Sequence, residues 1–408
     1  MKTSDSKVLD ICKDVSWVGV LDHDILTFDI VMETRQGTTY NSYFINAEKK
    51  AVIETVKENF SEVWLSKLRT LTDPADIEYV ILDHTEPDHS GSLIHLLEIA
   101  REVIVVGSGN AIRYLSDMVP GPFKSMVVKD GDTLDLGNRR LHFISAPNLH
   151  WPDSIYTYLE EDRLLFTCDS FGSHYCREEM FDDLVGDFHD SFKYYFDVIL
   201  KPFSKFMLKA IEKIRLLEIN TICTGHGPIL RSDWKKLVDI TEKYSIEYLK
   251  LTDNKPEKNV LITYVSAYGY TKEMAEAIAQ GILSRPNMKA TVMDIEKIEL
   301  GELEAEVVKC DALIVGSPTI NQNTLLPVYR LFAVINPLRD RGKLSAAFGS
   351  YGWSGEAVTI ISENLKNLKL KDFGENASFK FMPDETKTIE LVSFGNRFAD
   401  EVVRCNQA

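Results

Sequence analysis

The chain has 408 residues, of which 44% are hydrophobic, so two or three domains with buried cores are expected. Its formal net charge of −16 argues against nucleic acid or an anionic membrane surface as a partner. No apolar leader follows Met1 and no apolar run is long enough to span a membrane, so we expect a cytoplasmic protein.

The distribution of cysteine and histidine assigns metal chemistry to the first part of the chain. The six cysteines are scattered, and no two have the two-residue spacing of a zinc ribbon. Neither disulfides nor an iron–sulfur centre is therefore expected. All nine histidines lie at or before His226, so any histidine-ligated metal belongs to that part.

The first 60 residues predict scaffold elements. Residues 15–20 and 43–45 are strand-like, and a helix is predicted over residues 51–68. Residues 37–41 predict a turn that leads into a strand. His23 lies between two aspartates, where a solvated loop histidine is favoured over a metal ligand.

One six-residue stretch carries most of the chemistry. Four of its side chains are metal-ligand types: His84, Glu86, Asp88 and His89. The apolar run at 77–82 predicts a buried strand before it and residues 93–99 an apolar helix after it, so the stretch is a strand-to-helix loop. Pro87 is expected to hold the loop extended, with the first three ligands on one side. Four ligands exceed the needs of one ion, so two metals are expected; the alternative is a polar loop that caps the next helix.

Two histidines follow near the next strand. His142 alternates with apolar neighbours within residues 141–147 and is interpreted as an ordinary strand residue. The loop at 148–154 instead presents His150 beside an aromatic side chain, Trp151, which makes His150 a candidate ligand.

Two later segments complete the candidate ligands. The strand predicted over 163–167 ends at Asp169, where a carboxylate can bridge because each oxygen can take one metal. Cys168 is interpreted as a small buried filler in preference to a thiol beside the metals. His226 lies between two glycines, which allow the backbone to approach a site closely.

A polar linker at 252–258 separates two predicted domains, residues 1–254 and 255–408. Beyond it, strands over 259–265, 312–315 and 345–348 each end in a loop suited to a ligand, as in a doubly wound sheet.

The first of these loops is similar to the flavodoxin phosphate loop, which implies FMN, while Tyr351 and Trp353 can pack on a flavin ring. The alternative is a flavodoxin-like fold without flavin. The candidate FMN-binding residues are Ser266, Ala267, Tyr268, Gly269, Tyr270, Thr271, Ser317, Pro318, Thr319, Asn321, Ser350, Tyr351, Gly352, Trp353, Ser354 and Gly355.

The ligand stretch resembles the metal loop of the metallo-β-lactamase superfamily, with Glu86 where zinc members have a third histidine. A hard carboxylate there favours iron or manganese, so the whole chain resembles the flavodiiron proteins without a fused rubredoxin. The implied fold is a metallo-β-lactamase-like αββα sandwich followed by a flavodoxin-like parallel sheet. The resemblance implies one iron on His84, Glu86 and His150, the other on Asp88, His89 and His226, and a bridging Asp169.

The same resemblance makes His174, Tyr194 and Tyr195 candidate proton donors or hydrogen-bond partners. The chain departs from the family at Asn148, where relatives often have an apolar residue. It implies that FMN passes electrons from an external donor, such as rubredoxin or a reduced deazaflavin or nicotinamide system, to the irons. The irons would reduce dioxygen to water, nitric oxide to nitrous oxide, or both, in a head-to-tail homodimer or dimer of dimers. The alternatives are a zinc hydrolase with an attached flavodoxin domain and a non-catalytic gas sensor.

Overall fold

The computed structural model describes residues 7–28, 32–252 and 257–405. The chain divides into two compact units, Met1–Tyr248 and Leu249–Ala408. The predicted division between residues 254 and 255 falls outside the described residues and stays a prediction. No helix in the described ranges is long and apolar enough to cross a membrane.

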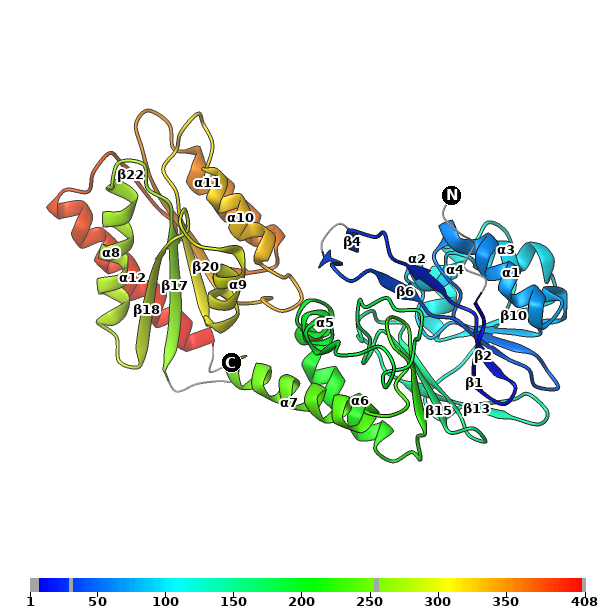
Figure 1. Ribbon diagram of the computed structural model, residues 1–408. Helices are drawn as coiled ribbons and strands as arrows, with labels where there is room; N and C mark the ends of the chain where they lie inside the picture. Colours follow the sequence, from blue (N-terminus) through cyan, green and yellow to red (C-terminus); the bar gives the residue numbers. More distant parts are fainter. Residues whose placement is uncertain (1–6, 29–31, 253–256, 406–408) are drawn as a thin grey trace. The chain divides into compact units, whose positions relative to one another are not determined.

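The first unit contains two larger sheets (Figure 1). The seven-stranded sheet has the order β1 (Leu9–Cys12), β2 (Val15–Trp17), β7 (Tyr43–Ile45), β8 (Ala51–Ile53), β9 (Tyr79–Ile81), β10 (Ile104–Gly107) and β11 (Lys124–Val127). The five-stranded sheet has the order β12 (Thr133–Asp135), β13 (Arg140–Ser145), β14 (Ile155–Leu159), β15 (Leu164–Cys168) and β16 (Thr221–Thr224). Two small pairs, β3 (Val20–Asp22) with β6 (Thr38–Tyr40) and β4 (Thr27–Phe28) with β5 (Met32–Glu33), lie apart from them.

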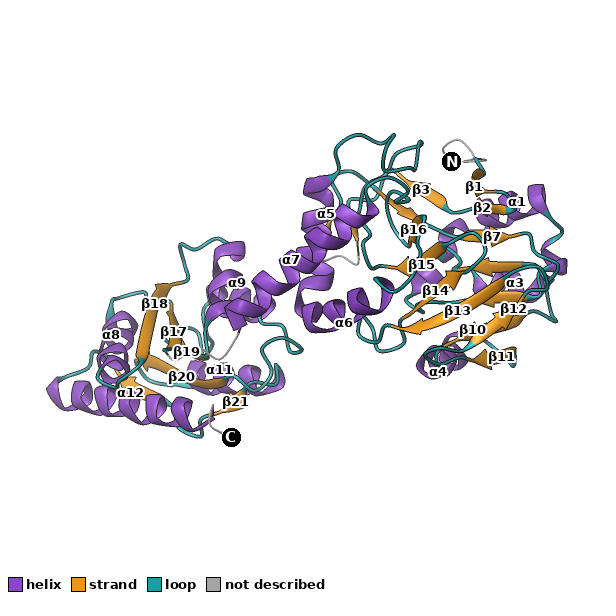
Figure 2. Ribbon diagram, turned by 90° about the horizontal axis from the view of Figure 1, so that it is seen from below, coloured by secondary structure: helices purple, strands orange, loops and turns teal. Residues whose placement is uncertain are grey.

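Helices cover the outer faces of both sheets, which makes the four layers of an αββα sandwich (Figure 2). The seven-stranded sheet packs on α1 (Ser61–Leu71), α3 (Leu93–Ile99) and α4 (Gly109–Met118). The five-stranded sheet packs on α5 (His189–Tyr195), α6 (Ser204–Ile214) and α7 (Trp234–Thr252). Short turns lie between them: η1 (Glu58–Phe60), η2 (Pro74–Asp76), α2 (Pro87–Ser90), η3 (Phe196–Leu200) and η4 (Lys201–Phe203).

The period of the strands explains why the central strands are apolar on both faces. In β9, Tyr79 and Ile81 enter the core between the sheets, whereas Val80 enters the outer core under the helices. In β15, Phe166 faces the inner core and Leu165 the outer core. Because successive side chains point to opposite faces, a strand with a layer on each side must be a continuous apolar run.

The second unit is a doubly wound parallel sheet, as predicted. Its strands have the order β18 (Met288–Asp294), β17 (Lys258–Tyr264), β19 (Ala312–Gly316), β20 (Leu344–Tyr351) and β21 (Lys371–Asp372), with β22 (Ala377–Lys380) also on β20. One face packs on α8 (Tyr270–Leu283) and α12 (Glu385–Cys405), the other on α9 (Leu300–Lys309), α10 (Leu326–Val334) and α11 (Glu356–Asn367). Glycine allows α8 to touch α12, since a Cβ at Gly281 would lie 2.1 Å from the carbonyl oxygen of Val392.

Two local predictions are wrong. Residues 51–68 do not form one helix, because β8 (Ala51–Ile53) opens the segment and α1 begins only at Ser61. The β-branched Val52 and Ile53 bury both faces of a strand between β7 and β9. The strand expected over 15–20 is broken near Gly19, where a Cβ would lie 2.3 Å from the carbonyl oxygen of Tyr40.

Candidate metal centre

The structure brings the seven predicted metal ligands into one cluster, in which five are buried and Glu86 and His150 are partly exposed. The loop after β9 supplies four of them, and the other three follow β13, β15 and β16. These are His84, Glu86, Asp88 and His89 from the first loop, followed by His150, Asp169 and His226. Their ligand atoms form two groups, in each of which all atoms lie within 4.8 Å of one another.

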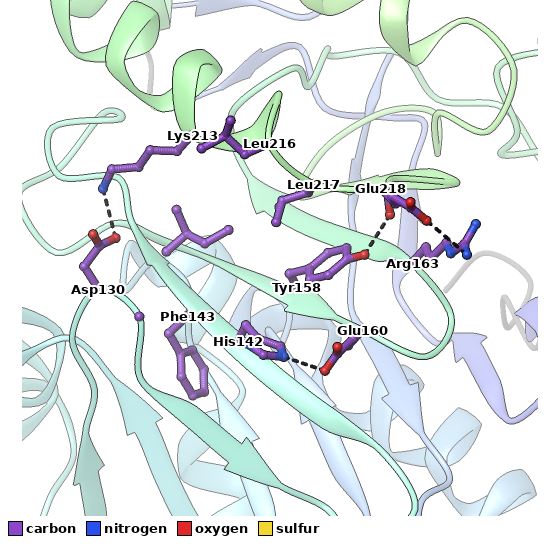
Figure 3. A pocket seen from close by; sticks show the side chains of 12 residues that line it. Asp130, His142, Phe143, Tyr158, Glu160, Arg163, Lys213, Leu216, Leu217 and Glu218 are labelled. Atoms are coloured by element: carbon purple, nitrogen blue, oxygen red, sulfur yellow. Dashed lines mark hydrogen bonds and ion pairs between the residues drawn. The ribbon is translucent and has the colours of Figure 1, made fainter.

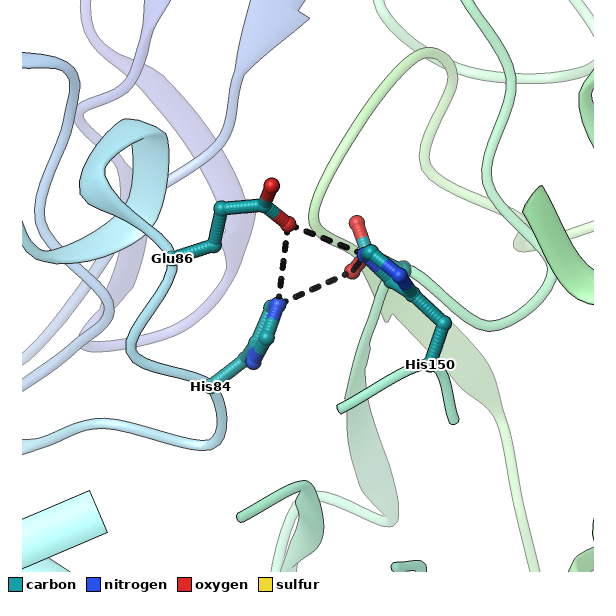
Figure 4. A group of neighbouring side chains, drawn as sticks. His84, Glu86 and His150 are labelled. Atoms are coloured by element: carbon teal, nitrogen blue, oxygen red, sulfur yellow. Dashed lines mark hydrogen bonds and ion pairs between the residues drawn. The ribbon is translucent and has the colours of Figure 1, made fainter. Parts of the chain in front are cut away.

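The first group contains His84, Glu86 and His150, which Figure 4 shows facing one another, together with Asp169. Glu86 Oε2 lies 3.2 Å from His84 Nε2 and 2.9 Å from His150 Nε2. Asp169 Oδ2 lies 3.6 Å and 3.5 Å from the same two nitrogens. Two imidazoles and two carboxylates therefore face a common point.

The second group contains Asp88, His89 and His226. Asp88 Oδ2 lies 3.4 Å from His89 Nε2 and 3.0 Å from His226 Nε2. The other oxygen of Asp169, Oδ1, lies 3.3 Å from His89 Nε2 and 3.4 Å from His226 Nε2. Asp169 thus presents one oxygen to each group, the geometry required of a bridging ligand.

The backbone of the ligand loop differs from the prediction. Pro87 is the first residue of the helical turn α2 and does not hold an extended segment. Proline fits there because the first residue of a helix needs no N–H partner. The helical turn carries Asp88 away from His84 and Glu86 and toward the second group, which is why one short loop serves both.

The electrostatics of the cluster favour cations. Burial works against ionised Glu86, but hydrogen bonds from His150 and His84 hold the pKa of Glu86 well below its usual range. Burial opposes the charge of His226, but hydrogen bonds to Asp169 and Asp88 raise its pKa to about 10. Protons thus occupy positions that metal ions would otherwise take.

The donor set fits two metal ions. The buried oxygens Asp88 Oδ1 and Asp169 Oδ2 have no hydrogen-bond partner among the described residues. A buried carboxylate without a donor is costly unless a cation compensates it. Imidazole nitrogen with carboxylate oxygen, and no thiolate in either group, suits iron or manganese.

Outer residues orient the histidines, and sequence reasoning missed them. Asp153 Oδ2 lies 3.3 Å from His84 Nδ1 and accepts hydrogen bonds of 2.8 Å from the amide and the hydroxyl of Thr85. His226 Nδ1 donates a 2.6 Å hydrogen bond to the carbonyl oxygen of Thr39. These partners of Nδ1 leave each Nε2 free to face the cluster. The only sequence signal for Asp153 was its place three residues after His150.

A pair of buried acids behind the ligand loop was also missed. Glu54 Oε1 accepts the amides of Asp83, at 2.7 Å, and His84, at 3.2 Å, and so fixes the end of β9. Burial raises the pKa of Asp83 to about 8 against the hydrogen bonds from Thr157. Burial, followed by the charge of Asp83, raises the pKa of Glu54 well above its usual range. Glu54 was missed because residues 51–68 were predicted to form a single helix.

Tyr195 and His174 lie beside the cluster, whereas Tyr194 does not. Tyr195 is 2% exposed, and its hydroxyl donates a 2.8 Å hydrogen bond to Asp169 Oδ1. His174 packs against the rings of Tyr195 and His226, and its Nδ1 lies 2.8 Å from Thr38 Oγ1. Burial, followed by the charge of His226, holds the pKa of His174 well below its usual range. Tyr194 is 43% exposed and lines the outer wall of a pocket that reaches His174.

Four further residues singled out in the sequence have defined surroundings: Cys168, Asn148, His142 and His23. Cys168 is buried, as predicted for a filler, and its Sγ also packs against the His89 ring, 3.5 Å from Nδ1 and 3.8 Å from Nε2. Asn148 has a φ of 64°, a left-handed conformation that asparagine tolerates better than apolar residues do. His142 is an ordinary strand residue, as predicted; its Nε2 lies 2.8 Å from Glu160 Oε2 in a separate pocket of about 630 Å³ (Figure 3). His23 joins neither ligand group.

The loops after β17, β19 and β20 line a pocket of about 420 Å³ in the second unit. Its lining residues are Tyr268, Tyr270, Pro318, Thr319, Ile320, Ser350, Tyr351, Gly352, Trp353 and Phe381. Tyr268 and Trp353 are each 80% exposed, so both rings are free to cover a planar ligand. Ile320 and Phe381 were not predicted; Phe381 follows β22, which the sequence did not reveal.

Three other predicted residues, Thr271, Ser317 and Gly269, support the same loops. The Thr271 hydroxyl lies 3.0 Å from that of Ser350, and Ser317 Oγ accepts the amide of Leu325 at 3.2 Å. Gly269, with a φ of 87°, precedes α8 and turns the first loop into that helix. The helix start presents amide groups suited to a phosphate.

The two units and the paired ligand groups define a protein in which a metallo-β-lactamase-like metal domain is joined to a flavodoxin-like domain. Residues 38–227 match the family described as ODP family beta lactamase, and residues 262–395 match flavodoxin. The flavo-diiron protein FprA2 of Clostridium acetobutylicum is 39% identical over 391 residues, which is 94% of this chain and 97% of the relative. The type A flavoprotein fprA of Rhodobacter capsulatus is 38% identical over 396 residues, or 96% and 91% of the two chains.

Solved structures agree with these relatives. The rubredoxin oxygen:oxidoreductase of Desulfovibrio gigas has a TM-score of 0.67 and 28% identity, over 98% of this chain and 100% of its own. The flavodiiron protein of Giardia intestinalis has a TM-score of 0.65 and 29% identity, over 98% of each chain. The chain belongs to the flavodiiron proteins, a family of oxidoreductases that use FMN and a non-haem diiron centre. The predicted family and fold are confirmed, and the zinc hydrolase alternative is disfavoured.

Proposed function

We propose that this protein takes electrons from an external donor through FMN to a diiron centre, where dioxygen is reduced to water, nitric oxide to nitrous oxide, or both. The observation that carries the proposal is Asp169, whose two carboxylate oxygens each face one group of ligands. A bridge of this kind holds two metal ions close enough to act on one small molecule.

Seven side chains would hold the two irons. His84, Glu86 and His150 would hold one ion, Asp88, His89 and His226 would hold the other, and Asp169 would serve both. Bound ferrous ions would supply electrons and open coordination positions for a diatomic gas.

The surrounding residues fix the ligands and handle protons. Asp153 and the carbonyl of Thr39 hold Nδ1 of His84 and His226, so that each ring presents Nε2. Tyr195 donates its hydroxyl proton to Asp169 Oδ1, and His174 packs against the Tyr195 ring. Reduction of dioxygen to two waters consumes four electrons and four protons. Tyr195 and His174, which contact the cluster, are the candidates to deliver those protons.

In the flavodoxin-like unit, the amides at the start of α8 and the hydroxyls of its first loop would bind the FMN phosphate. Tyr351 and Trp353 would pack on the flavin ring. FMN accepts electrons in pairs or singly and releases them singly, which suits a one-electron donor such as rubredoxin. The name of the Desulfovibrio gigas relative supports rubredoxin as donor and oxygen as substrate; a reduced deazaflavin or nicotinamide system is the other option.

We also propose that the working unit is a head-to-tail homodimer, alone or paired into a dimer of dimers, in which the flavin of one chain serves the irons of the other. Variants that cannot dimerise should keep both cofactors and lose turnover. An active monomer would refute this arrangement.

The test of the function begins with the metal and flavin content of the purified protein. Iron as the metal and FMN as the flavin are expected, followed by repeated reoxidation of the anaerobically reduced protein by dioxygen, nitric oxide or both. Zinc in place of iron, without turnover of either gas, would refute the proposal and favour a hydrolase. Binding of a gas without turnover would favour a sensor.

A further inference from the structure

Two aromatic rings lead from the proposed metal centre toward solvent. The Trp151 ring packs edge-on against the His84 imidazole, with ring centres 5.1 Å apart, and its centre lies 6.3 Å from that of the His150 ring. Trp151 also meets the ring of Tyr114 on α4, with ring centres 6.4 Å apart. Both aromatic side chains are half-buried. The rings therefore form a continuous series from a proposed iron ligand to a tyrosine that solvent reaches.

Hydrogen bonds hold the two rings in contact. The side-chain amide of Asn110, in the first turn of α4, donates to the carbonyl oxygen of Pro152 at 3.1 Å. The carbonyl oxygen of Trp151 accepts the amide of Asn148 at 2.8 Å, which closes the loop on itself. Helix α4, which carries Tyr114, is thus fastened to the loop that carries Trp151.

We propose that Trp151 and Tyr114 carry single electrons from a small reductant in solution, such as ascorbate or a thiol, to the metal centre when the flavin does not supply them. This role rests on the proposed reduction of dioxygen. Reduction of one dioxygen to two waters takes four electrons, of which two ferrous ions supply only two. A centre that has not received the other two through FMN remains oxidising, and Trp151 touches its ligand His84.

Each electron that passes inward takes one hydrogen atom from the reductant, whose proton ends in solvent. Trp151 gives one electron to the centre and receives one from Tyr114, so the indole is unchanged. Tyr114 releases its hydroxyl proton to solvent as it loses that electron, and the reductant then restores both. The guanidinium of Arg113 lies 5.3 Å from the centre of the Tyr114 ring. Its charge disfavours a second positive charge on the ring, so oxidised Tyr114 gives up the proton.

Two other tyrosines near the centre differ from Tyr114 in their exposure. The rings of Tyr40 and Tyr195 lie 5.9 Å and 6.2 Å from the ring of His226. They are only 1% and 2% exposed, so a reductant in solution does not reach them. Tyr114 combines a ring contact toward the centre with access to solvent.

The ring pair is tested without iron or dioxygen by pulse radiolysis of the full-length flavoprotein after removal of iron. Azide radicals oxidise accessible indoles, and the indole and phenoxyl radicals absorb at different wavelengths, so electron transfer from tyrosine to tryptophan is followed in time. The wild type should show a first-order transfer phase that Trp151→Phe and Tyr114→Phe both lose. Trp234→Phe and Tyr244→Phe are the matched controls and should keep it. Trp234 and Tyr244 are also half-buried, and the described ring contact of Tyr244 is with Phe196, which is no proposed ligand.

A second arm uses the iron-loaded protein, reduced with too little donor to refill the flavin, mixed with dioxygen and frozen for electron paramagnetic resonance. The wild type should develop a tyrosyl radical that ascorbate removes. Tyr114→Phe should accumulate a tryptophanyl radical in its place, and Trp151→Phe should show neither. Far-ultraviolet circular dichroism and FMN content establish that the variants fold. Tyr114→Phe removes only a hydroxyl group, so it carries the test should Trp151→Phe fail to fold.

A transfer phase that is unchanged in Tyr114→Phe, or a tyrosyl radical that survives this substitution, would overturn the proposal. Absence of the transfer phase with intact gas turnover would reject the electron route and leave the proposed function standing. Transfer between the rings without any gas turnover would reject the proposed function and retain the ring pair as an electron conductor.

Discussion

Replacement of Asp153 by asparagine tests whether outer carboxylates hold the proposed irons. Asp153 is fully buried, and its Oδ2 serves the amide of Thr85, the hydroxyl of Thr85 and His84 Nδ1. Asparagine keeps the shape and one acceptor oxygen but removes the negative charge. We therefore expect the fold to survive while His84 is held less firmly.

The size of the effect follows from these three contacts. A hydrogen bond to a charged group contributes about 1.5–3 kcal/mol and a neutral one about 0.5–1.5 kcal/mol. Because the three contacts share one oxygen, their losses do not add in full. The binding free energy of the metal at the position that uses His84 should fall by about 1.4–2.8 kcal/mol, which is a 10- to 100-fold weaker affinity. The position that uses Asp88 and His226 should be unaffected, since His226 is held by the carbonyl of Thr39.

The assay is competition between the metal-free flavoprotein and a chelator of known affinity, with ferrous or cobaltous ion under anaerobic conditions. Asp153→Asn should show one weakened and one unchanged site. The matched control is Asp132→Asn, since Asp132 also accepts a backbone amide, that of Lys129, but is exposed and belongs to no ligand group. Unchanged binding in Asp153→Asn, or equal loss at both sites, would refute the reasoning.

Four further outcomes are expected. Tyr195→Phe removes the hydrogen bond to Asp169, so turnover should fall about tenfold or more with iron content retained; unchanged turnover would exclude Tyr195 from the reaction. In the metal-free protein the pKa of His226 is raised to about 10, so protonated His226 should stabilise the fold fully below a pH of about 6.5 and lose this effect as the pH rises through about 10. Denaturant unfolding at several pH values measures the free energy of unfolding, and a contribution that grows with pH would contradict the prediction. Glu86→His should shift bound metal from iron toward zinc, which elemental analysis detects, and unchanged iron would show that Glu86 does not set the preference. Trp353→Ala should weaken FMN binding by about 0.5–1.5 kcal/mol, measured by the quenching of flavin fluorescence; unaltered affinity would place the flavin elsewhere.

The sequence predicted the main elements of the site because those elements depend on local rules. Ligand types that follow directly upon apolar strands, as His226 and Asp169 do, must gather at the edge where those strands end. The doubly wound fold follows from apolar strands that each end in a ligand loop, whereas the αββα fold was implied by the resemblance to the flavodiiron proteins.

The missed features depend on contacts between distant segments. Glu54 serves the amides of Asp83 and His84 across 29 and 30 residues, and no local pattern marks it. Asp153 supports His84 across 69 residues. Asp88 was predicted on the same side as His84 and Glu86, because proline allows an extended loop as well as the helical turn that the structure has. Contacts with distant segments decide between the two conformations.

The two proposed iron positions are unequal, and the inequality indicates where the substrate arrives. The side chains of Glu86 and His150 are 13% and 18% exposed, whereas those of Asp88, His89 and His226 are at most 6% exposed. A small molecule that enters from solvent therefore meets the Glu86 position first. At the deeper position, the Tyr195 hydroxyl donates a hydrogen bond to Asp169, and the Cys168 sulfur contacts the His89 ring.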